Sequence, residues 1–190
     1  MKTFWETVLV FIAFLTLSGV AFADDRDRDG GLEFKARLTG DQEVIAGQNP
    51  PLGTGSPAIG RIEVEFDKGF TKLDVDLMVS KNTVGTIFRA HFHCGRPGQN
   101  GPIIFGLFDP GPFPVSNIVK GTLTNADSTG ADCVPTIGRV VNNLASLALA
   151  MRDGLIYANV HSTPDFPGGE LRGQMIEVID DDKDHKFPRR

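Results

Sequence analysis

Several residue types are scarce in this sequence of 190 residues. It holds two cysteines, one tryptophan and one tyrosine, so a scaffold held together by many disulfides is excluded. After the first 23 residues no apolar run is long enough to span a membrane, which argues against further transmembrane helices. An excess of positive charge is also missing, since the formal net charge is -5. Nucleic acid and anionic membranes are therefore disfavoured as partners.

The one long apolar run lies at the N-terminus. Lys2 precedes the stretch Val8–Val20, and the small residues Ala21 and Ala23 follow it, a pattern typical of a secretory signal peptide. The apolar stretch is only about 13 residues long, whereas a membrane-spanning helix needs roughly 20. We therefore predict that residues 1–23 are cleaved, with an uncleaved membrane anchor as the alternative. The mature chain would begin at Asp24 and be secreted or periplasmic.

The mature sequence predicts one domain between two charged ends. Residues 24–31 and 180–190 are too charged and too poor in apolar residues to pack, so we expect a disordered acidic leader and a disordered tail. Residues 32–179 suffice for a single domain with its own core. No internal repeat divides this stretch.

Segments that alternate apolar and polar residues predict the secondary structure of this domain. Such alternation gives a strand one buried face, and turn residues separate the segments. The predicted strands are residues 32–38, 62–66, 73–79, 86–93, 103–108, 155–161 and 170–178. One helix is predicted over Val140–Asp153, with Gly154 as its stop signal. The pattern favours an all-β fold, an antiparallel sandwich with one short helix in a connection.

Cys94 and Cys133 both lie in the predicted mature chain. In an oxidising compartment two thiols most simply pair with each other, so we predict a disulfide. Cys94 directly follows His93, and the alternative is that its thiolate binds a metal.

Three histidines form the strongest candidate site. His91 and His93 lie two residues apart on a predicted strand, so their side chains point to the same face. His161 closes another predicted strand. Three neutral imidazoles are a plausible ligand set for copper or zinc. The alternative is that all three are polar residues at strand ends that form hydrogen bonds to loops.

A second candidate region is the segment 168–174, in which Glu170 and Arg172 alternate onto one face. They could act beside the metal or on an anion, or they could form a structural salt bridge or anchor a loop. No catalytic residue is predicted, because the sequence contains no Gly-x-Ser-x-Gly motif and both cysteines are expected to be bridged.

A resemblance to a known family rests on several motifs that occur together and in order. The motifs lie at residues 34–44, 90–95, 100–103, 121–124, 157–162 and 167–174. Together they resemble a CHRD domain, the module named from chordin, over about residues 32–178. The resemblance implies a β-sandwich in an extracytoplasmic protein with no settled biochemical activity.

A remoter resemblance concerns copper-zinc superoxide dismutases. It implies a Greek-key sandwich, superoxide-dismutase-like or immunoglobulin-like, in which His91, His93 and His161 match copper ligands and Arg172 matches the arginine that guides the anion. The bridging histidine and the zinc ligands of that family are missing from the loop after His93.

The expected function is therefore a secreted, non-catalytic module that binds a transition metal, copper favoured over zinc. One alternative is a structural or adhesive domain that binds an extracellular protein or matrix. A dismutase-like copper redox enzyme is the less favoured alternative. No membrane contact is expected after signal cleavage.

Overall fold

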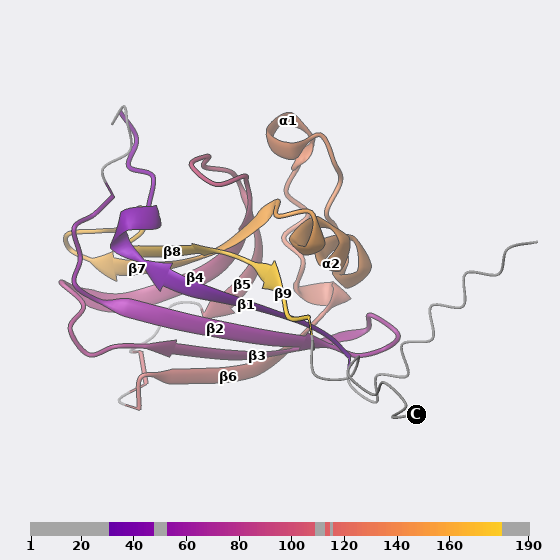
Figure 1. Ribbon diagram of the computed structural model, residues 1–190, viewed down its shortest axis with the longest axis horizontal. Coiled ribbons are helices and arrows are strands. Elements are labelled where there is room, and N and C mark those ends of the chain that lie inside the picture. The colour runs from indigo at the N-terminus through magenta and orange to yellow at the C-terminus, as the bar shows by residue number, and fades with distance from the viewer. Residues whose placement is uncertain (1–30, 48–52, 109–112, 115, 180–190) are drawn as a thin grey trace, which may run out of the picture.

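The computed structural model describes residues 31–47, 53–108, 113–114 and 116–179 (Figure 1). The predicted signal peptide, the tail and all of the leader except Gly31 lie outside these residues, so their predictions stay untested. Among the described residues, no helix has both the length and the apolar character that crossing a membrane requires.

The described residues form nine strands and two α-helices, with two short 3₁₀ turns in the connections. The strands are β1 (Leu32–Thr39), β2 (Ile59–Phe66), β3 (Lys72–Val79), β4 (Thr86–Cys94), β5 (Ile103–Phe108), β6 (Ile118–Thr124), β7 (Ile156–Thr163), β8 (Leu171–Gln174) and β9 (Ile176–Glu177). The helices are α1 (Val134–Ile137) and α2 (Leu144–Arg152), and the 3₁₀ turns are η1 (Gly40–Gln42) and η2 (Asn125–Asp127).

All strand pairs are antiparallel, and the strands follow the order β5-β4-β7-β8-β1-β2-β3-β6, with β9 paired to β1. The sheet curves back on itself, so that β1, β2, β3 and β6 form one layer and β4, β5, β7 and β8 the other (Figure 1). A bridge between Phe105 and Ser128 nearly closes the ring. The prediction of an all-β, antiparallel fold is confirmed.

The core lies between the two layers and follows from the alternation in the strands. In β2 every second residue, from Gly60 to Phe66, is buried, and the others are exposed. Phe34 and Phe66 meet edge to face, with their ring centroids 5.9 Å apart, and Phe92 of β4 is fully buried in the same core. Aromatic pairs of this kind add about 1 kcal/mol to the effect of burial.

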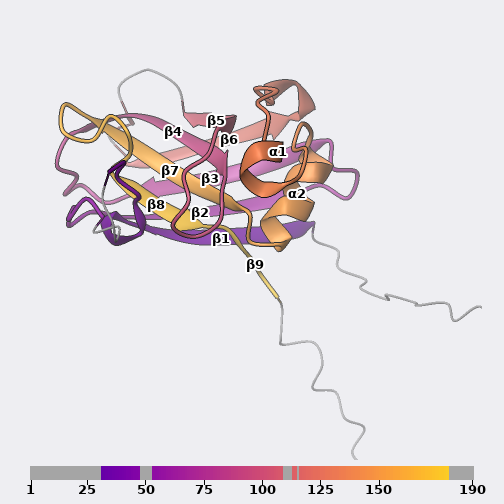
Figure 2. The ribbon, with the colours of Figure 1, turned by 90° about the horizontal axis from the view of Figure 1, so that it is seen from above.

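Four details differ from the sequence prediction. Strand β6 was not predicted, the last predicted strand divides into β8 and β9 around Met175, and α1 is an additional short helix. The predicted helix at Val140 begins instead at Leu144, because Asn143 caps it by accepting a hydrogen bond from the backbone N–H of Ser146 at 2.8 Å. The two helices lie together at one end of the molecule (Figure 2).

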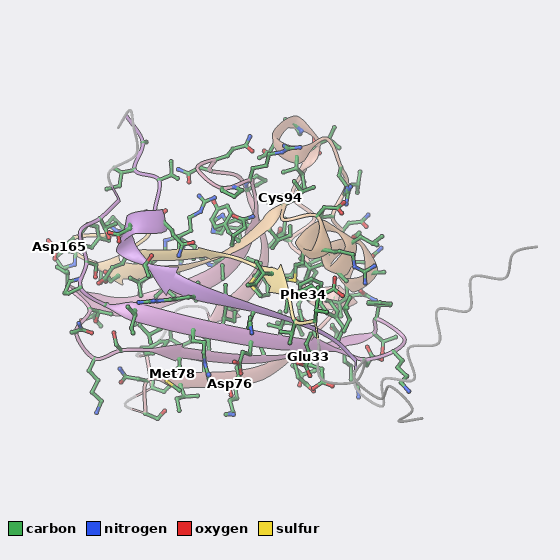
Figure 3. All side chains as sticks on the ribbon, viewed as in Figure 1. Glu33, Phe34, Asp76, Met78, Cys94 and Asp165 are labelled. Carbon is green, nitrogen blue, oxygen red and sulfur yellow. A yellow bond between two sulfur atoms is a disulfide. The ribbon has the colours of Figure 1, made fainter. Side chains whose placement is uncertain are left out.

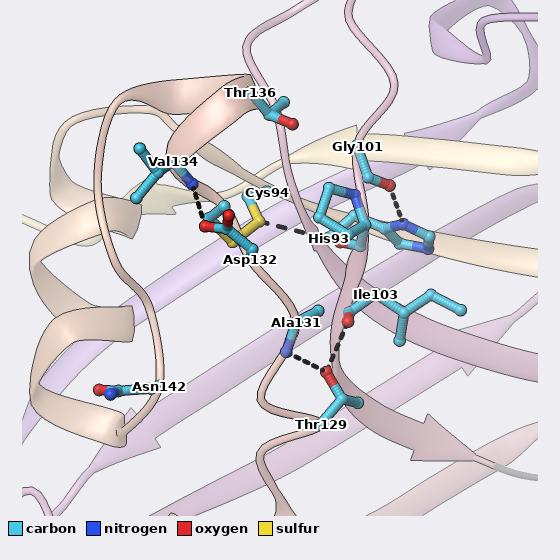
Figure 4. Close-up of a disulfide and its surroundings, with 12 residues drawn as sticks. His93, Cys94, Gly101, Ile103, Thr129, Ala131, Asp132, Val134, Thr136 and Asn142 are labelled. Carbon is cyan, nitrogen blue, oxygen red and sulfur yellow. Dashed lines mark hydrogen bonds between the residues drawn. A yellow bond between two sulfur atoms is a disulfide. The ribbon is translucent and has the colours of Figure 1, made fainter.

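Cys94 and Cys133 are bonded to each other and fully buried, with their Cα atoms 6.0 Å apart (Figure 4). The predicted disulfide is therefore present, and the alternative that Cys94 is a metal ligand is excluded in this state. The bond joins the end of β4 to the residue that precedes α1.

Candidate metal centre

The site lies on the outer face of β4, β7 and β8. In the β4–β7 ladder, His91 is opposite Asn159, His93 is opposite Tyr157, and Arg89 is opposite His161. Because opposite residues of paired strands point to the same side of a sheet, the three histidines share one face. The residues between them, such as Phe92, point into the core.

Unlike most outer faces, this one is covered. His91, His93 and His161 are only 4%, 8% and 7% exposed. The loop from Gly95 to Gly101 lies over part of the face. This position is shown by Gly101 O, which accepts a hydrogen bond from Nδ1 of His93 at 2.9 Å (Figure 4). We call the outer face of β4, β7 and β8 the covered face and residues 95–101 the covering loop.

The three imidazoles converge. One ring nitrogen from each histidine can be chosen so that all three lie within 4.8 Å of one another. Nδ1 of His91 and Nε2 of His161 are 3.1 Å apart, which corresponds to an angle of about 100° at a metal held 2.0 Å from each. Two ligands of one metal lie at most about 4 Å apart. A movement of about 1 Å or less therefore brings the third nitrogen into range.

Hydrogen bonds to loop carbonyls fix the tautomers of two histidines. Nδ1 of His93 donates to Gly101 O, and Nδ1 of His161 donates to Pro167 O at 3.0 Å. A carbonyl oxygen only accepts, so in both rings Nδ1 carries the proton and Nε2 has the lone pair. In His161 this lone pair accepts a hydrogen bond from Nδ1 of His91 at 3.1 Å, and a bound metal would take the place of that proton. The Nε2 atom of His93 is buried and has no hydrogen-bond partner among the described residues, an arrangement that is costly for a polar atom.

The electrostatics of the site keep these rings neutral. The pKa of His93 is lowered to about 4, mainly by burial and also by the nearby histidines and Arg172, although the bond to Gly101 opposes the shift. Burial also lowers the pKa of His161, with a smaller contribution from the positive charge of Arg89. Neutral imidazole is the form that binds metal, so His93 and His161 are in the ligand state at neutral pH.

Beside the histidines lies a stack of three planar groups. The rings of His93 and Tyr157 are parallel within 9° at a centroid distance of 4.8 Å, and the guanidinium carbon of Arg172 lies 3.5 Å from the centroid of the Tyr157 ring. Burial raises the pKa of the Tyr157 hydroxyl and lowers that of Arg172. Arg172 is 1% exposed.

Comparison with known families bears on this arrangement. The model of the CHRD domain matches residues 34–175. This chain belongs to the CHRD domain family. No curated protein matches it. Membership supports an extracellular β-sandwich module, and the buried disulfide agrees with that environment. The matched region of this CHRD domain contains all three histidines and both cysteines.

Arg172 and Glu170, the two predicted neighbours of the metal, contact loops of the CHRD domain. Arg172 donates three hydrogen bonds to the covering loop. Glu170 is fully buried, and its Oε1 accepts from the hydroxyl of Ser56 at 2.6 Å and from the backbone N–H of Val84 at 2.8 Å. These contacts favour the loop-anchor interpretation for both, and their action on a metal or an anion stays a prediction.

Sequence reasoning did not find a buried pair on the covered face. Nδ2 of Asn159 donates a short hydrogen bond to Glu43, which is 4% exposed. Burial raises the pKa of Glu43, although the bond from Val44, the charge of Arg172 and Asn159 oppose this. Asn159 could have been found, because it alternates with His161 on a predicted strand. Glu43 gave no such signal, since it lies after β1 in a connecting segment.

Proposed function

We propose that this CHRD protein is a secreted, non-catalytic module that binds one transition-metal ion, copper favoured, through His91, His93 and His161. The observation that carries the proposal is that three buried imidazoles converge, with one ring nitrogen of each within 4.8 Å of the others. The expected donor atoms are Nδ1 of His91 and Nε2 of His93 and His161. Since His91 would bind through Nδ1, its proton must sit on Nε2 when the metal is bound.

The competing interpretation is that the histidines only tie strand ends to loops. The bonds from His93 to Gly101 and from His161 to Pro167 do have that effect. They occupy Nδ1 alone, however, and such a bond is the usual means by which a protein orients a metal-binding histidine. The loop contacts therefore support the metal proposal, because they fix the orientation of both rings through Nδ1.

Copper is favoured over zinc on the chemistry of the ligands. Imidazole binds both metals, and nitrogen sites bind divalent copper more tightly than divalent zinc. When bound, copper could supply one-electron redox chemistry. The bridging histidine and the zinc ligands of copper-zinc superoxide dismutases are missing from the loop after His93. Storage, delivery or structural use of the metal is therefore preferred to a dismutase-like reaction.

Secretion belongs to the same proposal. It rests on the signal-peptide pattern of residues 1–23, and family membership and the Cys94–Cys133 disulfide are in keeping with it. Export would allow the metal to be captured after translocation.

The test is a titration of metal-free protein with copper and, separately, with zinc, each in competition with a chelator of known affinity. We expect one equivalent to bind, copper more tightly, and His93→Ala to weaken binding by at least about 100-fold. His185→Ala, a histidine outside the described residues, is the matched control and should bind as the wild type does. Equal affinity of the wild type and His93→Ala would refute the site. A wild type that binds no metal would leave the structural or adhesive module as the better account.

A further inference from the structure

Arg172 is a buried cation on β8 that donates hydrogen bonds to the covering loop. Its NH2 group donates to the backbone carbonyls of Arg96 and Gln99, both at 2.9 Å, and its NH1 group donates to Oδ1 of Asn100 at 3.1 Å. Three acceptors within the five-residue segment 96–100 thus share one side chain. The loop is thereby held to the sheet by a residue more than 70 positions away in sequence.

The covering loop in turn contacts His93. Its last residue, Gly101, accepts the hydrogen bond from Nδ1 of His93, and the backbone N–H of Gly101 donates to the hydroxyl of Tyr157 at 3.3 Å. A side chain at position 101 would not fit, because a Cβ there would lie 1.7 Å from the carbonyl oxygen of Cys94. The backbone of Gly101 is therefore pressed against the strand that carries His93.

A second path from Arg172 to His93 runs through the planar stack. The guanidinium lies against one side of the Tyr157 ring, and His93 stacks on Tyr157 in parallel. A guanidinium is planar, so one group can stack on an aromatic ring and direct its N–H groups at several acceptors at once. Lysine offers one point charge and could not replace both contacts.

We propose that Arg172 is a positioning residue of the metal centre, which holds the covering loop and Tyr157 so that Nε2 of His93 points toward His91 and His161. This inference rests on the proposed metal binding. Arg172 touches no metal; it acts through Gly101 and Tyr157. This role gives a reason for keeping a positive charge buried, which by itself would destabilise the fold.

The first experiment compares the copper and zinc affinities of the wild type and Arg172→Lys. We expect Arg172→Lys to weaken binding by about 10- to 100-fold, the range typical of residues that orient metal ligands. The control is Arg139→Lys, the same substitution at a guanidinium that pairs with Asp153 near α2, and it should leave the affinity unchanged. Equal affinities of the wild type and Arg172→Lys would overturn the inference.

The second experiment asks whether the effect passes through His93. In a His93→Ala background, Arg172→Lys should change the affinity less than threefold, because the ligand that Arg172 positions is already gone. Electron spin echo spectra of the copper-loaded protein should show three coordinated imidazoles in the wild type and two in Arg172→Lys. Full additivity of the two substitutions, or three imidazoles in the variant, would show that Arg172 serves only the fold.

A measurement without metal separates this inference from the proposed function. In metal-free protein, nitrogen NMR should show His93 with its proton on Nδ1, and Arg172→Lys should give a mixture of tautomers. If the wild type binds no metal but the tautomer still depends on Arg172, the metal proposal fails and the positioning role stands. An unchanged tautomer contradicts the positioning role. Should Arg172→Lys not fold, Asn100→Ala removes one of the three acceptors and is expected to act in the same direction with a smaller effect.

Discussion

The two outer faces of this sheet differ although both belong to strands with the same alternating pattern. On the layer of β1, β2, β3 and β6, the outward residues are exposed or half-buried and mostly charged. The charged residues among them include Glu33, Lys35, Glu63, Glu65, Asp74, Asp76 and Lys120. We call this the exposed face. In Figure 3, Asp76 and Met78 mark it on one side of the molecule, and Cys94 lies on the other side.

The covered face has a different composition because loops exclude water from it. Seven of the eight residues of β7 are buried, including Tyr157, Asn159 and His161, whereas in β2 four of eight are buried. A polar group under a cover needs a specific partner, whereas water satisfies one on the exposed face. The contrast teaches that alternation alone does not identify the solvent-facing side, and that the polar side under loops is where a site can form.

Removing the disulfide should have the largest effect on stability. Cys94→Ser combined with Cys133→Ser opens a closed loop with a sequence separation of 39 residues and should lower the free energy of unfolding by about 4 kcal/mol. Urea unfolding of the two proteins measures it. Hydrogen exchange should speed up first in the covering loop and last in β2 and β3. An unchanged unfolding midpoint, or equal acceleration on both faces, would break the comparison.

Acid should destabilise the covered face before the exposed one. The pKa of His93 is about 4 in the folded protein and near 6.5 when unfolded, so between these values the unfolded chain binds a proton that the folded one does not. The contribution of His93 to the free energy of unfolding is thus fully present above about pH 6.5. It falls by about 3 kcal/mol as the pH approaches 4. The lowered pKa of His161 acts in the same direction.

Glu43 acts in the opposite direction. Its pKa is raised in the folded protein, so its favourable contribution is complete below about pH 4.5 and is lost as the pH rises through its folded value. Urea unfolding between pH 4 and 8 gives the free energy of unfolding as a function of pH. We expect this free energy to change less steeply with pH in His93→Gln than in the wild type. The same slope in both would contradict the assignment to His93.

One pair of substitutions compares the faces directly. Asn159→Ala removes the hydrogen bond to the buried carboxyl of Glu43 and should cost about 2 kcal/mol, since Glu43 is left without this donor. Asp74→Ala on the exposed face, where Asp74 accepts from the hydroxyl of Thr122, should change stability by about 0.5 kcal/mol or less. Thermal unfolding of both variants measures the difference, and equal losses would show that the two faces do not differ in this respect.

The smallest effect is expected for a surface ion pair. Lys120 pairs with Asp76, and their side chains are 71% and 38% exposed. Lys120→Gln should lower stability by less than about 1 kcal/mol, and the loss should shrink in 1 M salt. A large loss that persists in salt would mean that the exposed face contains a structural site of its own.

Much of the fold followed from local pattern. The alternation of β1, β2 and β3 and the two-residue spacing of His91 and His93 depend on the period of a strand, which the sequence displays directly. Strand β6 escaped prediction because none of its residues is fully buried, and Gly121 interrupts its alternation. The start of α2 was misplaced because the cap at Asn143 outweighs the apolar Val140.

The site was only half predictable for a physical reason. Its three histidines belong to strands, and the position of a residue along a predicted strand indicates which face its side chain shares. The groups that orient them are brought in by connections, such as Glu43 after β1 and Gly101 in the covering loop, and these contacts join residues far apart in sequence. The sequence left loop anchoring as one option for Arg172, but most of its acceptors are backbone carbonyls, so no side-chain pattern indicates which loop it holds.

The most direct test of the central claim counts the imidazoles around copper. Metal-free wild-type protein loaded with one equivalent of copper should give an electron spin echo signal of three coordinated histidines. His91→Ala, His93→Ala and His161→Ala should each reduce the count to two. A signal that keeps the same number of histidines in all three variants would place the metal elsewhere and contradict the account.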